Sequence, residues 1–318
     1  MSYIILIIGF ILLIKGADIF VEGASNIAKK FGIPSIIVGL TIVSLGTSAP
    51  ELAVSLIASF EGNNGITIGN ILGSNIFNTL MVLGLTAIVM PIIIEKSNVI
   101  KDYIVNILVT ILLLVLSFGG KLLFNKEAEL NRLSGFILIG SCIVYIIYLI
   151  KTAKNKTEDS EDNKEVNILV SILKIIIGII GIIIGGNLVV NSASNIAYSF
   201  GLSDKLVGLT IVAMGTSLPE LVTSMIAALK GENDIAIGNV LGSNIFNILL
   251  ILGVSSTIKP IVISNSLLVD MLFLIIISLI LGIFIFKGNK DKLRLGKIEG
   301  LILVTLYIGY MAYIIFRN

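Results

Sequence analysis

The chain has 318 residues, of which 56% are hydrophobic and only 13% are charged. Soluble globular chains carry roughly 25% charged residues, so this composition argues against a soluble enzyme. There is no His and a single Cys, which excludes His-ligated zinc, Ser-His-Asp triads and an intrachain disulfide. The net charge of +2 gives no electrostatic reason to expect a nucleic acid as partner. The composition indicates an integral membrane protein.

Ten apolar stretches follow one another along the chain. Each is long enough for the roughly 20 residues with which a helix crosses a bilayer core. Their apolar runs are continuous rather than alternating, which favours helices over barrel strands. The first run lacks a basic leading segment, so we expect a span rather than a cleaved signal peptide. The predicted spans are 3–28, 34–60, 65–90, 101–119, 133–151, 167–198, 204–229, 234–257, 266–286 and 297–316.

The distribution of Lys and Arg predicts the orientation in the cell membrane. An even number of spans places both termini on one side, and that side carries six basic residues against fourteen on the other. Because basic residues concentrate in cytoplasmic loops, we predict that both termini are extracellular. The mixed-charge segment 152–166 is then a cytoplasmic linker between an N-terminal five-helix repeat, 1–151, and a C-terminal one, 167–318.

The two halves repeat one another at an offset of 169 residues. Gly39–Gly84 aligns with Gly208–Gly253 without a gap, and 30 of these 46 positions are identical. The strongest blocks read Gly-Thr-Ser-x-Pro-Glu, ending at Glu51 and Glu220, and Gly-Ser-Asn-Ile-Phe-Asn, ending at Asn78 and Asn247. Five spans per half make the second half enter the membrane from the opposite face. The sequence therefore predicts an all-α membrane protein of ten transmembrane helices in two inverted five-helix repeats, the architecture of many secondary transporters.

Polar residues inside these spans follow the helical period. Pro50 cannot donate to the carbonyl of Gly46, so we expect the second helix to break there and expose carbonyl oxygens. Around the break, spacings of three and four residues place a set of polar side chains on one face; it comprises Ser44, Ser48, Glu51 and Ser55, with counterparts Ala213, Ser217, Glu220 and Ser224. The next helix carries a second polar stripe of Asn70, Ser74 and Asn78, repeated as Asn239, Ser243 and Asn247.

Two glutamates within the membrane need a source of positive charge. An intramembrane carboxylate costs about 2.5–3.5 kcal/mol on insertion scales, and neither repeated block places a Lys or Arg in its motifs. The surrounding carboxylate, hydroxyl, amide and carbonyl oxygens are hard ligands, which suit Ca²⁺ or Na⁺. Two carboxylates balance one Ca²⁺, and neutral oxygens nearby can hold Na⁺. Mutually exclusive occupation of shared ligands would itself produce antiport.

At these residues the sequence resembles the sodium/calcium exchanger family, whose two alpha-repeats look like the paired blocks described above. The resemblance covers essentially all ten spans. It implies exchange of Ca²⁺ for Na⁺ by alternating access, with no cofactor, no protein partner, and helices one and six sliding against the remaining core. It also implies the following ion ligands: Glu51 and Glu220; the backbone carbonyls of Thr47, Thr216, Ser44 and Ala213; the side chains of Ser48, Ser217, Ser74 and Ser243; and Asn78 and Asn247.

Two departures from relatives refine this expectation and leave alternatives open. Relatives that include the potassium-dependent branch carry Asp where this chain has Asn247, so we expect no potassium dependence. Cation/proton exchangers of the same superfamily usually have Gly-Asn before their glutamate, which favours Na⁺ over H⁺ here. A Ca²⁺/H⁺ exchanger stays open as an alternative, and a cation channel as a distant one. Binding more than two Na⁺ per Ca²⁺ would make the exchange electrogenic, because the two glutamates fix the charge of the site.

The first span also carries Lys15, Asp18 and Glu22. The sixth span has no acidic counterparts, so a duplicated ligand role is not supported. We expect Lys15 to pair with Asp18 or Glu22, or these residues to lie near solvent, with a role in structure or gating.

Overall fold

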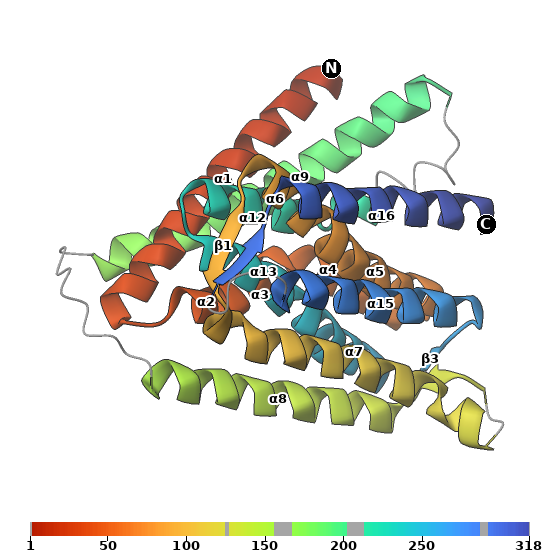
Figure 1. Cartoon of the computed structure of the whole chain (residues 1–318). Coiled ribbons are helices and arrows are strands. Elements are labelled where there is room, and N and C mark those ends of the chain that lie inside the picture. Colours follow the sequence, from red (N-terminus) through yellow and green to blue (C-terminus); the bar gives the residue numbers. More distant parts are fainter. Residues whose placement is uncertain (1, 125–126, 156–166, 202–212, 287–291, 318) are drawn as a thin grey trace.

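A computed structural model describes residues 2–124, 127–155, 167–201, 213–286 and 292–317. The described chain is built from helices, as the sequence predicts, and Figure 1 shows most of them packed side by side. In the first half the elements are α1 (Ser2–Phe31), α2 (Ser35–Val38), η1 (Gly39–Val43), α3 (Ser44–Thr47), α4 (Ala49–Glu61), α5 (Asn64–Phe77), η2 (Asn78–Val82), α6 (Leu83–Val89), β1 (Ile92–Glu95), α7 (Lys96–Phe124), β2 (Glu129–Leu130) and α8 (Arg132–Asn155).

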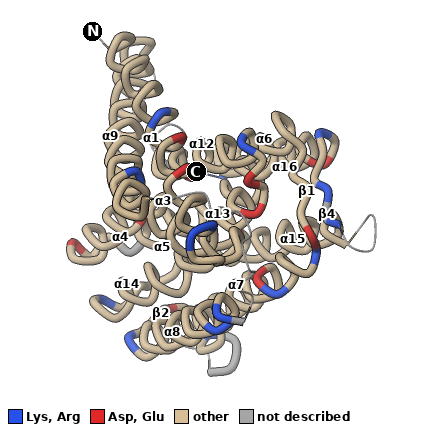
Figure 2. Tube along the Cα trace, turned by 90° about the vertical axis from the view of Figure 1, so that its left-hand side faces the viewer, with Lys and Arg blue, Asp and Glu red and all other residues tan. Residues whose placement is uncertain are grey.

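The second half repeats much of this order. Its elements are α9 (Ile168–Ser199), α11 (Ala213–Gly215), α12 (Leu218–Leu229), α13 (Asn233–Phe246), η4 (Asn247–Leu252), α14 (Gly253–Ile258), β3 (Ile261–Val262), α15 (Ser266–Phe286), β4 (Lys292–Leu295) and α16 (Lys297–Arg317). The segments η1, η2 and η4 are π-helical turns, a feature that is rare and often marks functional sites. Charged residues are sparse along the described part of the trace (Figure 2).

Eight of the ten predicted spans are found within the described residues as helices long and apolar enough to cross a membrane. The predicted span 34–60 corresponds to two helices, Ser35–Thr47 and Ala49–Glu61, bent by 50° at the break, and counts as a ninth span if the pair crosses as one. The seventh predicted span, 204–229, is described only in its second part, where α12 contributes 12 residues. Residues 202–212 and most of the predicted linker lie outside the described chain. The count of ten and the inverted relation of the halves therefore stay predictions.

Two short antiparallel strand pairs join the halves, which the sequence analysis did not predict. Strand β1 pairs with β4, with Ile92 opposite Leu295 and Glu95 opposite Lys292. Strand β2 pairs with β3 through only two residues on each strand. Both pairs lie next to helix ends and connect segments from different halves, so they hold the halves together outside the helical core.

Helices α1 and α9 cross at very short distance, and Figure 1 shows them leaving the rest of the bundle together. Glycines on both helices make this approach possible. A Cβ atom added at Gly16 would lie 2.7 Å from the backbone nitrogen of Ile182, and one added at Gly185 would lie 2.5 Å from that of Leu13. Small residues of this kind allow transmembrane backbones to come into contact.

The buried core divides into two hydrophobic clusters. The larger one gathers side chains such as Ile76 of α5, Leu113 of α7 and Phe246 of α13, together with residues of α8, α15 and α16. The smaller one lies between α1, α9, η1 and α12, and includes Phe20 and Ile182. The pair α1 and α9 therefore has its own packing surface, separate from the main core.

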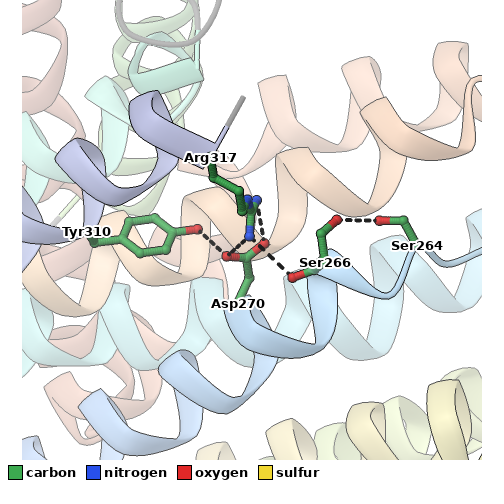
Figure 3. A network of polar contacts seen from close by, with 5 residues as sticks. All are labelled: Ser264, Ser266, Asp270, Tyr310 and Arg317. Carbon is green, nitrogen blue, oxygen red and sulfur yellow. Dashed lines mark hydrogen bonds and ion pairs between the residues drawn. The ribbon is translucent and has the colours of Figure 1, made fainter.

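The C-terminal helix is fixed to its neighbour by a polar cluster (Figure 3). The guanidinium of Arg317 binds both carboxylate oxygens of Asp270, at 3.0 Å each, and donates to the carbonyl of Ser266 at 3.2 Å. The hydroxyl of Tyr310 donates to Asp270 at 3.3 Å. A bidentate ion pair of this kind has a defined geometry, so it sets the position of α16 relative to α15.

Candidate functional site

Both predicted glutamates stand at the start of a helix that follows a break. In the first half the chain leaves helical geometry at Ser48, where φ is −82° and ψ is 10°. Helix α4 resumes with Pro50 in its first turn and Glu51 directly after it. In the second half Ser217, with φ −92° and ψ 5°, precedes α12 in the same way, with Glu220 in the first turn. The break that Pro50 predicts is thus confirmed, and a helix start favours negative charge.

Each carboxylate is hydrogen-bonded by a serine from the other half. The hydroxyl of Ser48 donates to Glu220 Oε1 at 2.8 Å, and that of Ser217 donates to Glu51 Oε1 at 3.0 Å. Both glutamate side chains are completely buried. Because each serine lies three residues before the glutamate of its own half, these reciprocal bonds bring the two glutamates into one site.

A second serine from the neighbouring helix of the same half completes each carboxylate's contacts. Ser74 of α5 donates to Glu51 Oε1 at 3.3 Å, and Ser243 of α13 donates to Glu220 Oε1 at 3.4 Å. In both glutamates the other oxygen, Oε2, is buried and has no hydrogen-bond partner within the described chain. Each carboxylate therefore has one oxygen held by serines and one oxygen free.

Asn70 and Asn239, the first residues of the two polar stripes, form hydrogen bonds that join the two halves. Asn70 Nδ2 donates to Ser55 Oγ at 3.0 Å and to the carbonyl of Glu51 at 3.3 Å, while its Oδ1 accepts from Thr216 at 3.4 Å. Asn239 repeats this arrangement with Ser224, the carbonyl of Glu220 and the hydroxyl of Thr47. The threonine hydroxyls thus donate to asparagines of the opposite half. That the backbone carbonyls of Thr47 and Thr216 bind ions, as the resemblance implies, stays a prediction.

Asn78 and Asn247 open the two π-helical turns η2 and η4. Both side chains are completely buried. Neither polar atom of Asn78 has a partner within the described chain, and Asn247 Oδ1 has none either. Burying an amide oxygen without a hydrogen bond is costly, so we expect these oxygens to bind something other than a hydrogen-bond donor of the protein.

The two remaining predicted carbonyl ligands are those of Ser44 and Ala213. The carbonyl of Ser44 accepts from the backbone N–H of Ser48 at 3.0 Å. The hydroxyl of Thr47 lies 3.3 Å from the same carbonyl, but its one hydrogen is shared with Asn239 Oδ1 at 3.0 Å. Ala213 opens α11 directly after the residues that the structure leaves undescribed. Their roles as ligands stay predictions.

The free atoms define what the site can do chemically. Among the side chains predicted as ion ligands, four buried oxygens lack a hydrogen-bond partner within the described chain: Oε2 of Glu51 and of Glu220, and Oδ1 of Asn78 and of Asn247. The described residues contain no group of three His, Cys, Asp or Glu side chains placed to hold a metal ion. Two carboxylates among neutral oxygens match the needs of a hard cation such as Ca²⁺ or Na⁺, carried as a substrate.

Asp18 and Glu22 take no part in the contacts of this site. The predicted pairing with Lys15 within α1 is wrong, but the alternative expectation, a position near solvent, is confirmed by side chains that are 40% and 47% exposed. Asp18 binds Lys230 at 2.7 Å, and Glu22 binds Lys174 of α9 at 2.6 Å. These partners are distant in sequence, so helical spacing alone could not indicate them.

A ring of polar contacts between α5 and α13 escaped the sequence analysis as well. It contains Asn75, Thr79 and Asn244, all buried. The repeated Gly-Ser-Asn-Ile-Phe-Asn block holds Asn75 and Asn244 at equivalent positions. Their identity in both halves was the available signal.

Comparisons with known proteins identify the family to which the chain is similar. The family model described as "Sodium/calcium exchanger protein" matches residues 1–151 and 170–316. The sodium/calcium exchanger MaX1 of Methanosarcina acetivorans is 33% identical, over 99% of this chain and 99% of that protein. The inner membrane protein YrbG of Escherichia coli is 35% identical, over 80% and 79% of the two chains.

Solved structures give the same result. The sodium-calcium exchanger NCX_Mj, soaked with zero Na⁺ and Ca²⁺, superimposes with a TM-score of 0.83 at 36% identity, over 98% of both chains. Soaked with 2.5 mM Na⁺ and 0.1 mM Ca²⁺, it gives a TM-score of 0.80 at 34% identity. The family model covers nearly the whole sequence and the fold matches at full length, so this multi-pass membrane protein belongs to the sodium/calcium exchanger family, cation transporters that use no cofactor.

Proposed function

We propose that this chain exchanges Ca²⁺ for Na⁺ across the cell membrane, with its central site open to one side at a time. The observation that carries the proposal is the set of four buried, unpartnered oxygens, two from carboxylates and two from amides. Membership of the exchanger family supports the choice of the two ions. The names of MaX1 and NCX_Mj attribute sodium/calcium exchange to those two relatives.

In the proposed mechanism the two cations compete for the same carboxylates. Glu51 and Glu220 together carry two negative charges, which one Ca²⁺ balances. Serine hydroxyls and the carbonyls beside the helix breaks provide further neutral oxygens for Na⁺. Because each glutamate is bonded by the other half, movement of one half relative to the other would change the ligand set. Alternate exposure of the site would then couple the flow of one ion to the counterflow of the other.

The function can be tested in sealed vesicles containing the purified protein. Vesicles loaded with Na⁺ and diluted into Na⁺-free buffer are expected to accumulate Ca²⁺, and Glu51→Gln or Glu220→Gln to abolish this uptake. Glu61→Gln is the matched control, because Glu61 ends the same helix as Glu51 and is exposed. Saturable counterflow would distinguish an exchanger from a channel, and uptake by both glutamate variants at the normal rate would contradict the assignment of the site.

The same vesicles identify the coupling ion. We expect uptake to follow the Na⁺ gradient, to need no K⁺, and to respond to an imposed membrane potential if more than two Na⁺ move per Ca²⁺. Uptake that ignores Na⁺ and follows a pH gradient would establish a Ca²⁺/H⁺ exchanger instead. A requirement for K⁺ would contradict the expectation drawn from the neutral Asn247.

The proposed orientation places both termini outside the cell and 152–166 in the cytoplasm. The chain has one cysteine, the buried Cys142, so Cys142→Ser provides a background for labelling. A cysteine introduced as Ser160→Cys is expected to react with an impermeant thiol reagent only after the cells are opened. Reaction in intact cells would reverse the orientation.

A further inference from the structure

Asn75 is held in one orientation by a backbone carbonyl. Its Nδ2 donates to the carbonyl of Asn244 at 3.0 Å. A carbonyl oxygen can only accept, so the amide of Asn75 cannot turn round without losing this bond and facing oxygen against oxygen. Asn75 is 1% exposed, so water cannot replace the bond. Its Oδ1 must therefore point away from Asn244.

The orientation of the Asn75 amide determines that of the Asn247 amide. The Nδ2 of Asn247 donates to Asn75 Oδ1 at 3.0 Å. Because Asn75 presents an acceptor, Asn247 can meet it only with its NH₂ group. The oxygen of Asn247 is then turned away from Asn75, and it is the buried Oδ1 that lacks a partner. The free oxygen at position 247 is thus a consequence of how Asn75 is anchored.

The equivalent residues of the other half do not form this pair of hydrogen bonds. The counterpart of this bond would join Asn78 to Asn244, but Asn244 Nδ2 donates instead to the hydroxyl of Thr79 at 3.0 Å, and Thr79 donates to the carbonyl of Asn75 at 2.8 Å. The residue equivalent to Thr79 in the second half is Ile248, which has no hydroxyl. Asn78 has no partner for either polar atom within the described residues. One central amide is oriented and the other is not.

We propose that Asn75 is a positioning residue that turns the oxygen of Asn247 toward the transported Ca²⁺. The inference rests on the proposed function only in its choice of ion. The same bond suits the neutral amide at 247, because an ionised carboxylate there would have no hydrogen to donate and would meet Asn75 Oδ1 as a second acceptor.

The test compares Asn75→Leu with Asn244→Leu. Both variants remove a buried amide of similar size from the same helix crossing, but of the two only Asn75 has a side-chain hydrogen bond to Asn247 in the described chain. Binding of Ca²⁺ to the purified full-length protein in detergent is measured by calorimetric titration, with the thermal midpoint recorded for each variant. We expect Asn75→Leu to raise the half-saturating Ca²⁺ concentration about five- to ten-fold, in line with the loss of one hydrogen bond. Asn244→Leu is expected to lower the thermal midpoint as much as Asn75→Leu does, but to leave the half-saturating Ca²⁺ concentration unchanged.

Three results would overturn the inference: unchanged affinity in Asn75→Leu, an equal loss in Asn244→Leu, or no binding by the unmodified protein. If either leucine variant fails to fold, the pair Asn75→Ser and Asn244→Ser makes the same comparison with smaller side chains. Because binding is measured without a Na⁺ gradient, failure of exchange in vesicles would count against the proposed function alone.

Discussion

At the scale of residues, the site depends on hydroxyl groups that cross between the halves. Ser48 and Ser217 each occupy the non-helical position at a break, and each donates to the carboxylate of the opposite half. At a helix start such serines usually cap their own helix, yet neither makes a side-chain cap bond here. Their hydroxyls bond the glutamates instead, so serine at these positions stabilises the paired carboxylates rather than the start of its own helix.

Replacing either serine by alanine is therefore expected to weaken cation binding, because each variant loses one hydrogen bond to a glutamate. A hydrogen bond to a charged group contributes about 1.5–3 kcal/mol, so Ser48→Ala and Ser217→Ala should each raise the half-saturating cation concentration about ten-fold or more. Ser59→Ala is the matched control, because this buried hydroxyl bonds the carbonyl of Ser55 within its own helix. Calcium titration of the three purified variants checks the prediction. A large difference between Ser48→Ala and Ser217→Ala would argue against equivalent roles.

At the scale of elements, the crossing of α1 and α9 depends on the absence of side chains. Gly16 and Gly185 face the backbone of the opposite helix at distances that a Cβ atom cannot occupy. The resemblance to exchangers implies that these two helices slide together against the core, and their separate hydrophobic cluster fits a unit of this kind. Ion pairs such as Asp18 with Lys230 connect the unit to α12 and the loop that follows it.

Gly185→Ala is expected to push the two helices apart and to lower both the thermal midpoint and the rate of Ca²⁺ uptake. Because overpacking costs about 1–3 kcal/mol, the effect on unfolding should be easily measured. Gly140→Ala in α8 is the control, since a Cβ atom there meets nothing within 4 Å. Alanine also has the higher helix propensity, so the control variant should be as stable as the original or slightly more stable. Equal behaviour of the two variants would contradict the close crossing.

At the scale of the whole molecule, neither half contains a complete site. The reciprocal serine bonds, the contacts of Asn70 with Thr216 and of Asn239 with Thr47, and the two strand pairs all join one half to the other. A half on its own would bury a glutamate without its opposite serine, which is strongly unfavourable.

Separate expression of residues 1–155 and 167–318 tests this dependence. We expect Na⁺-dependent Ca²⁺ uptake only in vesicles that contain both halves, with activity lost completely when either is omitted. Co-expressed halves carrying Glu51→Gln serve as the negative control. Uptake by one half alone would mean that it assembles a site with copies of itself, and would contradict the arrangement described here.

The sequence predicts the outline of the fold and the site because both depend on regular patterns. Apolar runs, the prolines and the 169-residue repeat indicate the spans, the break before Pro50, and the two glutamates. The contacts between distant segments could not be predicted in this way. Asp18 pairs with Lys230 rather than with Lys15, because three-dimensional packing rather than helical spacing brings them together. The orientation of Asn247 depends equally on a partner in the other half, for which periodicity contains no signal.

The reciprocal bonding of Ser48 with Glu220 and of Ser217 with Glu51 also bears on how a duplicated gene can change. A substitution in one copy of the motif alters the surroundings of the glutamate in the other copy, so the two copies cannot diverge independently at these positions. The ion pair of Asp18 with Lys230 carries no such dependence, because its two positions are matched by Asn187 and Glu61 in the other copies. The serines and glutamates that bond each other are constrained to change together, whereas a contact made in one copy only leaves its counterpart free to differ.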